Sequence, residues 1–316
     1  MWRTCLLIIV MAVGMTACSG EEESDVEPQT TTAVETLPTD SGDEGGVEPL
    51  PTAELETLQT NFDAVSAAFM NANRTKDLET FRQLLTDDAE LHDGEDPKIG
   101  IEEFMEAVSS PWSKFPGMDG RISGTFLGRD EVLNRQEVYG FLGWSEESPL
   151  IEWDLLEVRD GLIARWSFFY NPETRVFFIP SPEQEAADQT AAAWLTRYTS
   201  AWSSGDPAVV ADLYAPGTVR EDTLFQKQAA GPTEVEAYAT DWFDWYPDVT
   251  VEMLEPIIER TSREPLTGGV FAIRLPQEQE SCEVRIVVLL DTSDEGIVRE
   301  RVYYDTDSLA ACGWVS

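Results

Sequence analysis

The sequence contains few of the residues from which metal sites and nucleophilic sites are built. It has a single histidine, His92, and four cysteines, of which Cys5 and Cys18 lie close to the N-terminus. A site with several histidine ligands is therefore excluded, and the two remaining cysteines are too few for a tetrahedral zinc site. The chain also lacks a glycine-rich phosphate loop, a G-x-S-x-G turn and a dinucleotide-binding fingerprint. We predict that the protein binds no metal and no cofactor.

Basic residues are scarce relative to acidic ones. The chain has 21 lysines and arginines against 60 aspartates and glutamates, and its formal net charge is −39. Such a charge repels polyanions, so we exclude nucleic acid and an anionic membrane surface as direct partners. The acidity fits a role in solubility or a salty medium, and a site for a cationic ligand is the alternative.

The N-terminal segment has the three-part layout of an export signal. Arg3 supplies one positive charge, an apolar run covers residues 5–13, and small residues lead to Cys18. The apolar run is too short to span a bilayer stably, which favours a cleaved signal over residues 1–17. Residues 18–55 are acidic, rich in Thr, Pro and Gly, and without periodicity, so we predict a disordered tether.

The residues that end this signal resemble the lipobox of bacterial lipoproteins. The stretch Met15-Thr16-Ala17-Cys18 departs from the commonest form by having Met15 in place of Leu. The resemblance implies cleavage before Cys18 and attachment of a diacylglyceryl group to its sulfur. The protein would then be held on a membrane of the bacterial cell envelope, outside the cytoplasm. An ordinary signal peptide or an anchor helix is the alternative.

Cys282 and Cys312 are predicted to form a disulfide. Two cysteines in an exported domain are more often paired than free. Cys282 opens an apolar strand-like run, and a hairpin turning near Asp294 would place it opposite residue 305. Residues 306–312 must then fold back to bring Cys312 to it. We expect this bond to pin the C-terminus.

The order of predicted elements occurs twice along the chain. The segment "RDGLIARWSFFYN" at residues 159–171 ends the first copy, and "DEGIVRERVYYDT" at residues 294–306 ends the second. Each copy has a helix with apolar residues at helical spacing, a short second helix, a brief strand, a third helix and four strands. The four strands are expected at 120–129, 132–144, 150–159 and 162–170, and at 248–260, 268–275, 282–291 and 297–305. This order predicts an α+β fold in which each copy has its own antiparallel sheet with helices on one face.

The two copies resemble the SnoaL-like branch of the NTF2-like superfamily. The resemblance rests on Asp77 and Asp206 before the second helix, Gly100 and Gly231 before the third, and the closing hairpin. It implies two tandem domains, at residues 56–175 and 186–316. Each would be a cone in which a strongly curved antiparallel sheet and its helices surround a pocket. Members often pair through their sheets, so the copies are expected to form an intramolecular pseudo-dimer.

Three residues are candidates for acid–base catalysis, because enzymes of this fold use a carboxylate or a histidine inside an apolar cavity. His92 and Asp93 lie on the strand after the second helix, where the second copy has Asp222 but no histidine. Asp305 matches a position near the end of the closing strand at which several SnoaL-like enzymes have an essential Asp. An ion pair between Asp305 and Arg301 is the structural alternative.

Strand alternation and aromatic clusters give the candidate pocket residues. Strict alternation places Leu162, Ala164, Trp166, Phe168 and Tyr170 on one face of the first closing strand, and Ile297, Arg299, Arg301, Tyr303 and Asp305 on one face of the second. The pocket candidates are Trp166, Tyr170, Asp222, Trp242, Arg301 and Tyr303. An aromatic cage for a cation would suit the acidic charge, whereas core packing is the usual role of such clusters.

Three functional hypotheses remain open at this point. The first is a lipid-anchored, non-catalytic module that binds a small molecule or another protein. The second is a SnoaL-type acid–base enzyme (an isomerase, dehydratase, cyclase or epoxide hydrolase) acting on a small apolar substrate. The third is a structural accessory protein of the envelope. An apolar cavity with one desolvated carboxylate or histidine would favour the enzyme, whereas interiors filled by Trp and Phe would favour the third hypothesis.

Overall fold

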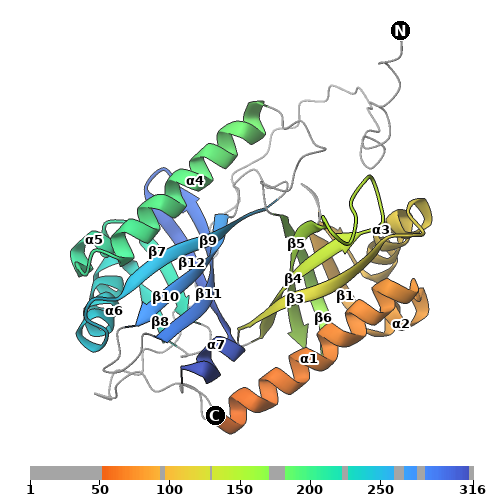
Figure 1. Ribbon diagram of the computed structural model, residues 1–316, viewed down its shortest axis with the longest axis horizontal. Helices are drawn as coiled ribbons and strands as arrows, with labels where there is room; N and C mark the ends of the chain where they lie inside the picture. The colour runs from red at the N-terminus through yellow and green to blue at the C-terminus, as the bar shows by residue number, and fades with distance from the viewer. Residues whose placement is uncertain are drawn as a thin grey trace, which may run out of the picture. The chain divides into compact units, whose positions relative to one another are not determined.

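The computed structural model describes residues 52–92, 97–128, 130–170, 182–222, 227–259, 267–275 and 282–312, which belong to one compact unit (Figure 1). Residues 52–170 are the first half and residues 182–312 the second half. The export signal, residues 18–51 of the predicted tether and Asp93 lie outside the described residues. Residues 52–55 were predicted as disordered tether but begin the first helix, so the tether prediction is wrong at its C-terminal end. None of the helices in these ranges has both the length and the apolarity that a membrane crossing requires.

The first half follows the predicted order of elements. Along the chain these are α1 (Thr52–Thr75), α2 (Leu78–Gln83), β1 (Leu85–His92), β2 (Lys98–Ile99), α3 (Ile101–Lys114), β3 (Asp119–Leu127), β4 (Glu131–Tyr139), β5 (Leu150–Arg159) and β6 (Leu162–Tyr170). Asp77 caps α2, since its carboxylate accepts a hydrogen bond from the backbone N–H of Thr80 at 3.1 Å. Gly100 precedes α3 with a φ of 89°, a conformation that favours glycine.

The second half repeats this order and adds a C-terminal helix. Its elements are α4 (Pro182–Trp202), α5 (Pro207–Ala211), β7 (Tyr214–Asp222), β8 (Lys227–Ala230), α6 (Gly231–Trp245), β9 (Thr250–Glu259), β10 (Thr267–Leu275), β11 (Cys282–Ser293), β12 (Gly296–Asp305) and α7 (Thr306–Ala311). Asp206, which was predicted to precede the second helix of this half, caps α5, and Pro207 occupies the first turn. The α+β class is confirmed, whereas the short strands β2 and β8 and helix α7 were not predicted.

The sheet in each half is mixed, so the prediction of a wholly antiparallel sheet is wrong. Strands β3 to β6 run antiparallel to one another, and so do β9 to β12. In contrast, β1 pairs with β6 in parallel, and β7 pairs with β12 in parallel. The reason is connectivity. A helix and several strands separate β1 from β6, and likewise β7 from β12, so no tight hairpin imposes a reversal of direction on these pairs.

Bulges in the closing strands correct the predicted strand faces. The pairing of β5 with β6 shifts so that Ala164 is the extra residue, and Val298 is the extra residue where β12 pairs with β11. One extra residue inverts the alternation on one side of a bulge. Ile163 therefore shares a core with Trp166, which strict alternation had placed on the other face. Ile297 likewise lies in the second-half core and not on the face of Arg301.

Buried side chains gather in three clusters. One lies between the helices and the sheet of the first half, and one occupies the corresponding place in the second half. The third cluster draws residues from both sheets: Phe126, Leu133, Ile151, Trp153, Leu155, Phe169, Ile257, Val270, Val287, Leu289 and Tyr303. Burying one large apolar side chain contributes roughly 1.5–3 kcal/mol, so this third cluster holds the two halves together strongly.

The sheets of the two halves are also hydrogen-bonded to each other, so the expectation of two separate sheets is wrong. Strand β6 pairs with β9, and β12 pairs with β3. The paired residues are Phe169–Glu259, Tyr170–Ile258, Tyr304–Leu127 and Asp305–Phe126. Because the sheets share a core, the backbone groups at these strand ends come close enough to satisfy each other. Because β11 also pairs with β12, strands β3 to β6 and β9 to β12 form a closed ring of hydrogen-bonded strands.

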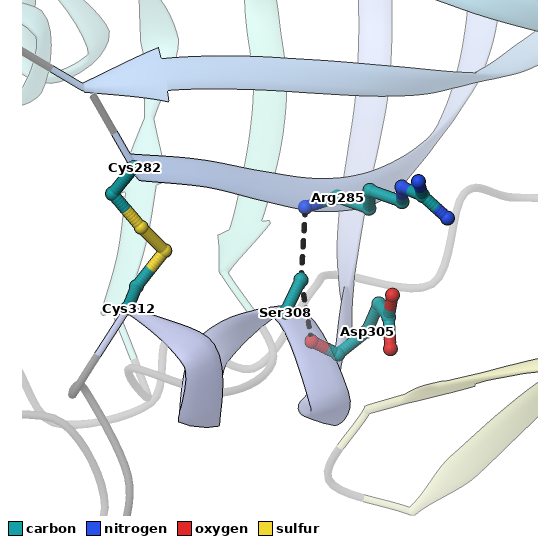
Figure 2. Close-up of a disulfide and its surroundings, with 5 residues drawn as sticks. All are labelled: Cys282, Arg285, Asp305, Ser308 and Cys312. Carbon is teal, nitrogen blue, oxygen red and sulfur yellow. Dashed lines mark hydrogen bonds between the residues drawn. A yellow bond between two sulfur atoms is a disulfide. The ribbon is translucent and has the colours of Figure 1, made fainter. Parts of the chain in front are cut away.

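The predicted disulfide between Cys282 and Cys312 is confirmed (Figure 2). Helix α7 brings Cys312 back along β11, as the predicted return of residues 306–312 required. Asp305 caps this helix by accepting from the N–H of Asp307 at 3.1 Å, and Ser308 Oγ accepts from the N–H of Arg285 at 2.9 Å. The disulfide and these hydrogen bonds fix the end of the described chain on the second-half sheet.

Candidate functional site

Among the described residues of the first half, Asp154 is the one buried carboxylic acid. Strand β5 directs its side chain into the core between sheet and helices, where it is 1% exposed. Its Oδ1 accepts a hydrogen bond from the indole Nε1 of Trp166 at 2.8 Å. Burial raises the pKa of Asp154 well above its ordinary value, and the charge of Glu152 raises it further, against the hydrogen bond from Trp166.

Aromatic rings pack against Trp166, the hydrogen-bond partner of Asp154. Trp166 meets Phe69 edge-on at 4.7 Å and Phe104 at 5.9 Å between ring centroids, and Phe81 meets Trp112 at 5.5 Å. Two hollows in the described part of the chain are open grooves elsewhere, one against α2 and α3 and one against α4. Asp154 is therefore hydrogen-bonded to a member of an aromatic cluster in the first-half interior.

We expect the neutral form of Asp154 to stabilise the fold. Because its pKa is higher in the folded state than the ordinary value of about 3.9, the folded state binds more protons between the two values. The contribution of Asp154 to the free energy of unfolding is then fully present at low pH. It is lost as the pH rises through the folded pKa, by up to about 1.4 kcal/mol per pH unit. Asp154→Asn retains an oxygen for Trp166 and cannot ionise, so urea unfolding from pH 4 to 8 should show that this loss is absent.

The exposed acid Asp87 on β1 provides the matched control for this measurement. Asp87→Asn makes the same chemical change at the surface, and we expect it to keep the pH dependence of the wild type. If both variants showed the same dependence of the free energy of unfolding on pH, the claim that Asp154 is neutral in the folded state would be contradicted.

The interior of the second half contains a buried ionic cluster among its aromatic side chains. Arg220 on β7, Asp222 on β7 and Glu300 on β12 are 5%, 1% and 0% exposed. Arg220 Nε lies 3.3 Å from Glu300 Oε2, and its Nη1 lies 3.8 Å from Asp222 Oδ2. One guanidinium cation therefore lies between two carboxylates in a site with little solvent contact.

Four tyrosines surround these carboxylates with hydroxyl donors. Tyr198 donates to Glu300 Oε1 at 2.7 Å, and Tyr214 donates to Glu300 Oε2. Asp222 Oδ2 accepts from Tyr238 at 2.9 Å and from Tyr304 at 2.7 Å. Burial, followed by the charge of the carboxylate that each one contacts, raises the pKa of Tyr198, Tyr214 and Tyr304 well above the ordinary value. These phenols therefore stay protonated and remain hydrogen-bond donors.

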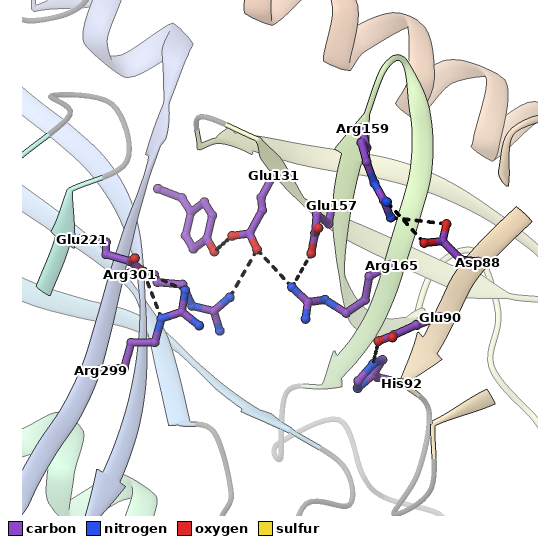
Figure 3. A network of polar contacts seen from close by, with 11 residues as sticks. Asp88, Glu90, His92, Glu131, Glu157, Arg159, Arg165, Glu221, Arg299 and Arg301 are labelled. Carbon is purple, nitrogen blue, oxygen red and sulfur yellow. Dashed lines mark hydrogen bonds and ion pairs between the residues drawn. The ribbon is translucent and has the colours of Figure 1, made fainter. Parts of the chain in front are cut away.

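The catalytic candidates do not gather in either interior. His92 follows Leu91, whose side chain lies in the first-half core, so alternation directs His92 to the opposite face of β1. There its Nε2 lies 2.9 Å from Glu90 Oε2, as Figure 3 shows. Asp305 caps α7, and burial raises its pKa. The position of Asp93 lies outside the described residues.

Two pocket candidates, Arg301 and Tyr303, contact Glu131 of the first half, and Figure 3 shows Arg301 beside Glu131. Arg301 Nη1 is 3.4 Å from Glu131 Oε1, and Tyr303 donates its hydroxyl hydrogen to Glu131 Oε2. Arg165 Nη2 is 3.8 Å from the same Glu131 Oε1. The ion pair of Arg301 thus crosses to the first half, in place of the pair with Asp305 that was the structural alternative.

The remaining pocket candidates divide between the two interiors. Trp166 lies in the first-half interior, Asp222 in the second, and Trp242 packs partly buried against the second-half core. The backbone of Tyr170 ends β6, but its side chain lies outside the described residues.

Sequence reasoning missed Asp154, Arg220 and Glu300 as site residues. For Glu300 a signal existed, since alternation placed it on one face with Val302 and Tyr304.

Comparison with known proteins finds a match to part of the first half. Residues 66–166 match the model of a family described as SnoaL-like domain. This stretch is therefore similar to SnoaL-like domains, as the sequence resemblance implied for this region. A search of the curated proteins finds no match.

Solved structures of this fold cover a part of the chain. A protein of Catenulispora acidiphila with a ketosteroid isomerase-like fold, in complex with trimethylamine, aligns with 18% identity over 39% of this chain and 93% of its own, with a TM-score of 0.34. A putative SnoaL-like polyketide cyclase of Shewanella denitrificans aligns with 13% identity over 39% of this chain and 95% of its own, with a TM-score of 0.32. A putative polyketide cyclase of Sinorhizobium meliloti aligns with 17% identity over 34% of this chain and 97% of its own, with a TM-score of 0.30.

Proposed function

We propose that this chain is a non-catalytic protein-interaction module of the bacterial cell envelope, anchored through a lipid on Cys18. The observation that carries the proposal is that side chains of the chain itself contact one another in both interiors. Aromatic rings surround Asp154 in the first half, and Arg220 with its tyrosines occupies the second. Such interiors leave the outer surface for recognition and favour a protein partner over a small-molecule ligand. The structural accessory role is the case in which that partner is a larger envelope assembly.

We further infer that the second half is another SnoaL-like unit, and that the two units form an intramolecular pseudo-dimer. The repeated order of elements, the parallel pairs β1–β6 and β7–β12 and the matching bulges at Ala164 and Val298 support the second copy. The buried cluster shared by both sheets supports the pairing. So do two contacts of Glu255 on β9 with the first half, an ion pair to Arg135 at 2.9 Å and a hydrogen bond from Trp153 Nε1 at 3.2 Å.

An acid–base enzyme is the second candidate, and Asp154 is the observation that favours it. A carboxyl group with a raised pKa among aromatic rings is the kind of general acid that such enzymes use. The enzyme ranks second because His92 is directed to the other face of its strand and Asp305 caps a helix. Asp154 therefore has no described catalytic partner among the residues that the sequence nominated.

Release from the membrane tests both the anchor and the filled interiors. We expect Cys18→Ala to move the protein from the membrane fraction to the soluble fraction, because no acyl chain can then be attached. Cys5→Ala is the matched control, since it changes a cysteine of the signal and leaves Cys18, and it should stay with the membrane. Native mass spectrometry of the released protein should give the mass of the polypeptide alone. Unchanged fractionation would contradict lipid anchoring, and a stoichiometric small molecule would contradict the filled interiors.

A further inference from the structure

We propose that the interior of the second half is a site for a small organic cation, and that the chain occupies this site with its own Arg220. In this proposal the guanidinium group of Arg220 is a built-in ligand. The chemical class that the site recognises is an alkylguanidinium. The proposal concerns the second-half interior alone and does not depend on lipid anchoring or on a protein partner.

The surroundings of Arg220 have the chemistry of an aromatic cation cage. The guanidinium carbon lies 3.9 Å from the ring centroid of Tyr238 and 5.3 Å from that of Trp202. Cations within about 6 Å of a ring face are attracted by its quadrupole, and more strongly when water is absent. The carboxylates of Glu300 and Asp222 supply the counter-charge at 3.3 and 3.8 Å.

The cage is held in shape by residues other than Arg220. The hydroxyls of Tyr198 and Tyr214 fix Glu300, and those of Tyr238 and Tyr304 fix Asp222. These tyrosines come from different elements, namely α4, β7, α6 and β12. A group whose orientation is fixed by such partners remains aimed at the site when the ligand is removed. The cage is therefore expected to persist without the Arg220 side chain.

The corresponding place in the first half shows that packing does not require an ion pair here. In the parallel pairing of β7 with β12, Arg220 lies beside Glu300, and in that of β1 with β6, Leu91 lies beside Trp166. An apolar pair thus fills in one half the position that an ion pair fills in the other. Buried ion pairs are commonly no more stabilising than apolar residues of similar size. The ionic set is better explained by recognition of a cation than by a need for stability.

The charge of the cluster also points to a cation. Two carboxylates face one guanidinium, so the cage has an excess of acceptors for positive charge. Arginine offers five N–H donors in a planar fork and stays charged at every accessible pH. An alkylguanidinium that enters in its place would present the same fork to Glu300 and Asp222 and the same flat face to Tyr238.

Chemical complementation tests the proposal in the full-length chain. Arg220→Ala removes the built-in cation, and ethylguanidinium has the atoms that this change deletes. We expect millimolar ethylguanidinium to raise the melting temperature of Arg220→Ala saturably, by about 5–10 °C at a ligand concentration 100-fold above its dissociation constant. The neutral analogue ethylurea should not raise it, and the wild type should not respond to either compound.

Two further variants separate a specific site from a general effect of the compound. Arg274→Ala removes an arginine that is half exposed and paired with Glu252 and Glu283, and it should not respond to ethylguanidinium. Adding Glu300→Gln to Arg220→Ala should abolish the response, because the counter-charge is reduced. If Arg220→Ala does not fold, the yield of folded protein after refolding should recover with ethylguanidinium and not with ethylurea. Equal effects of the two compounds, an equal effect on Arg274→Ala, or no effect would overturn the proposal.

Discussion

Replacing Arg220 by methionine is expected to lower the free energy of unfolding by about 3–5 kcal/mol. Methionine fills much of the volume of the arginine side chain but leaves Asp222 and Glu300 buried without a cation. Breaking a buried ion pair from one side is costly because the remaining charge has neither water nor a partner. Urea unfolding of the purified protein at pH 7 measures the effect.

The two buried carboxylates account for the expected loss in Arg220→Met. Adding Asp222→Asn and Glu300→Gln should restore much of the stability at pH 7, since a neutral set replaces the unpaired charges. The control is Arg274→Met, because Arg274 is half exposed and its loss should change the free energy of unfolding by no more than about 0.5 kcal/mol. Similar losses in Arg220→Met and Arg274→Met would show that the cation of the buried cluster contributes no more to the free energy of unfolding than a surface arginine.

Trp153→Ala is the second large effect that we expect, with a loss of about 3–5 kcal/mol. Trp153 is fully buried in the cluster that both sheets share, and its indole Nε1 donates to Glu255 of the second half at 3.2 Å. Truncation to alanine leaves a cavity at the contact between the halves and an acceptor without its donor. Because this contact couples the halves, the wild type should melt in one transition and Trp153→Ala in two, as calorimetry would show.

Trp245 provides the comparison for this second effect. It ends α6 and is 43% exposed, so Trp245→Ala removes a ring of the same size from a surface position. We expect a much smaller loss of stability and a single melting transition. If Trp245→Ala were as damaging as Trp153→Ala, or if Trp153→Ala still melted as one unit, the shared core would not be what couples the halves.

The order of elements could be predicted because it depends on local signals. Apolar residues at helical spacing, the capping residues Asp77 and Asp206 and the glycines before the third helices are all visible in the sequence. The bulges at Ala164 and Val298 could not be predicted, because no glycine or proline marks them. One unmarked residue in each strand was enough to invert the predicted faces of Ile163 and Ile297.

The candidate site was less predictable than the fold, because charged residues normally lie in solvent. Arg220 and Glu300 look like surface residues of two strands in a chain with many acids. Their burial follows from the parallel pairing of β7 with β12, which brings together residues that are distant in the sequence. Asp222 was found because the two copies could be aligned, whereas nothing local distinguished Asp154 from other acids.

The shared core between the sheets has a consequence for the protein at low abundance. Two separate subunits that met through such a core would dissociate on dilution, and each would then show its apolar sheet face to other molecules. Here both sheets belong to one polypeptide, so their local concentration is set by the connecting segment and not by the number of copies in the cell. A scarce protein would therefore keep this face covered, with no need of a second chain.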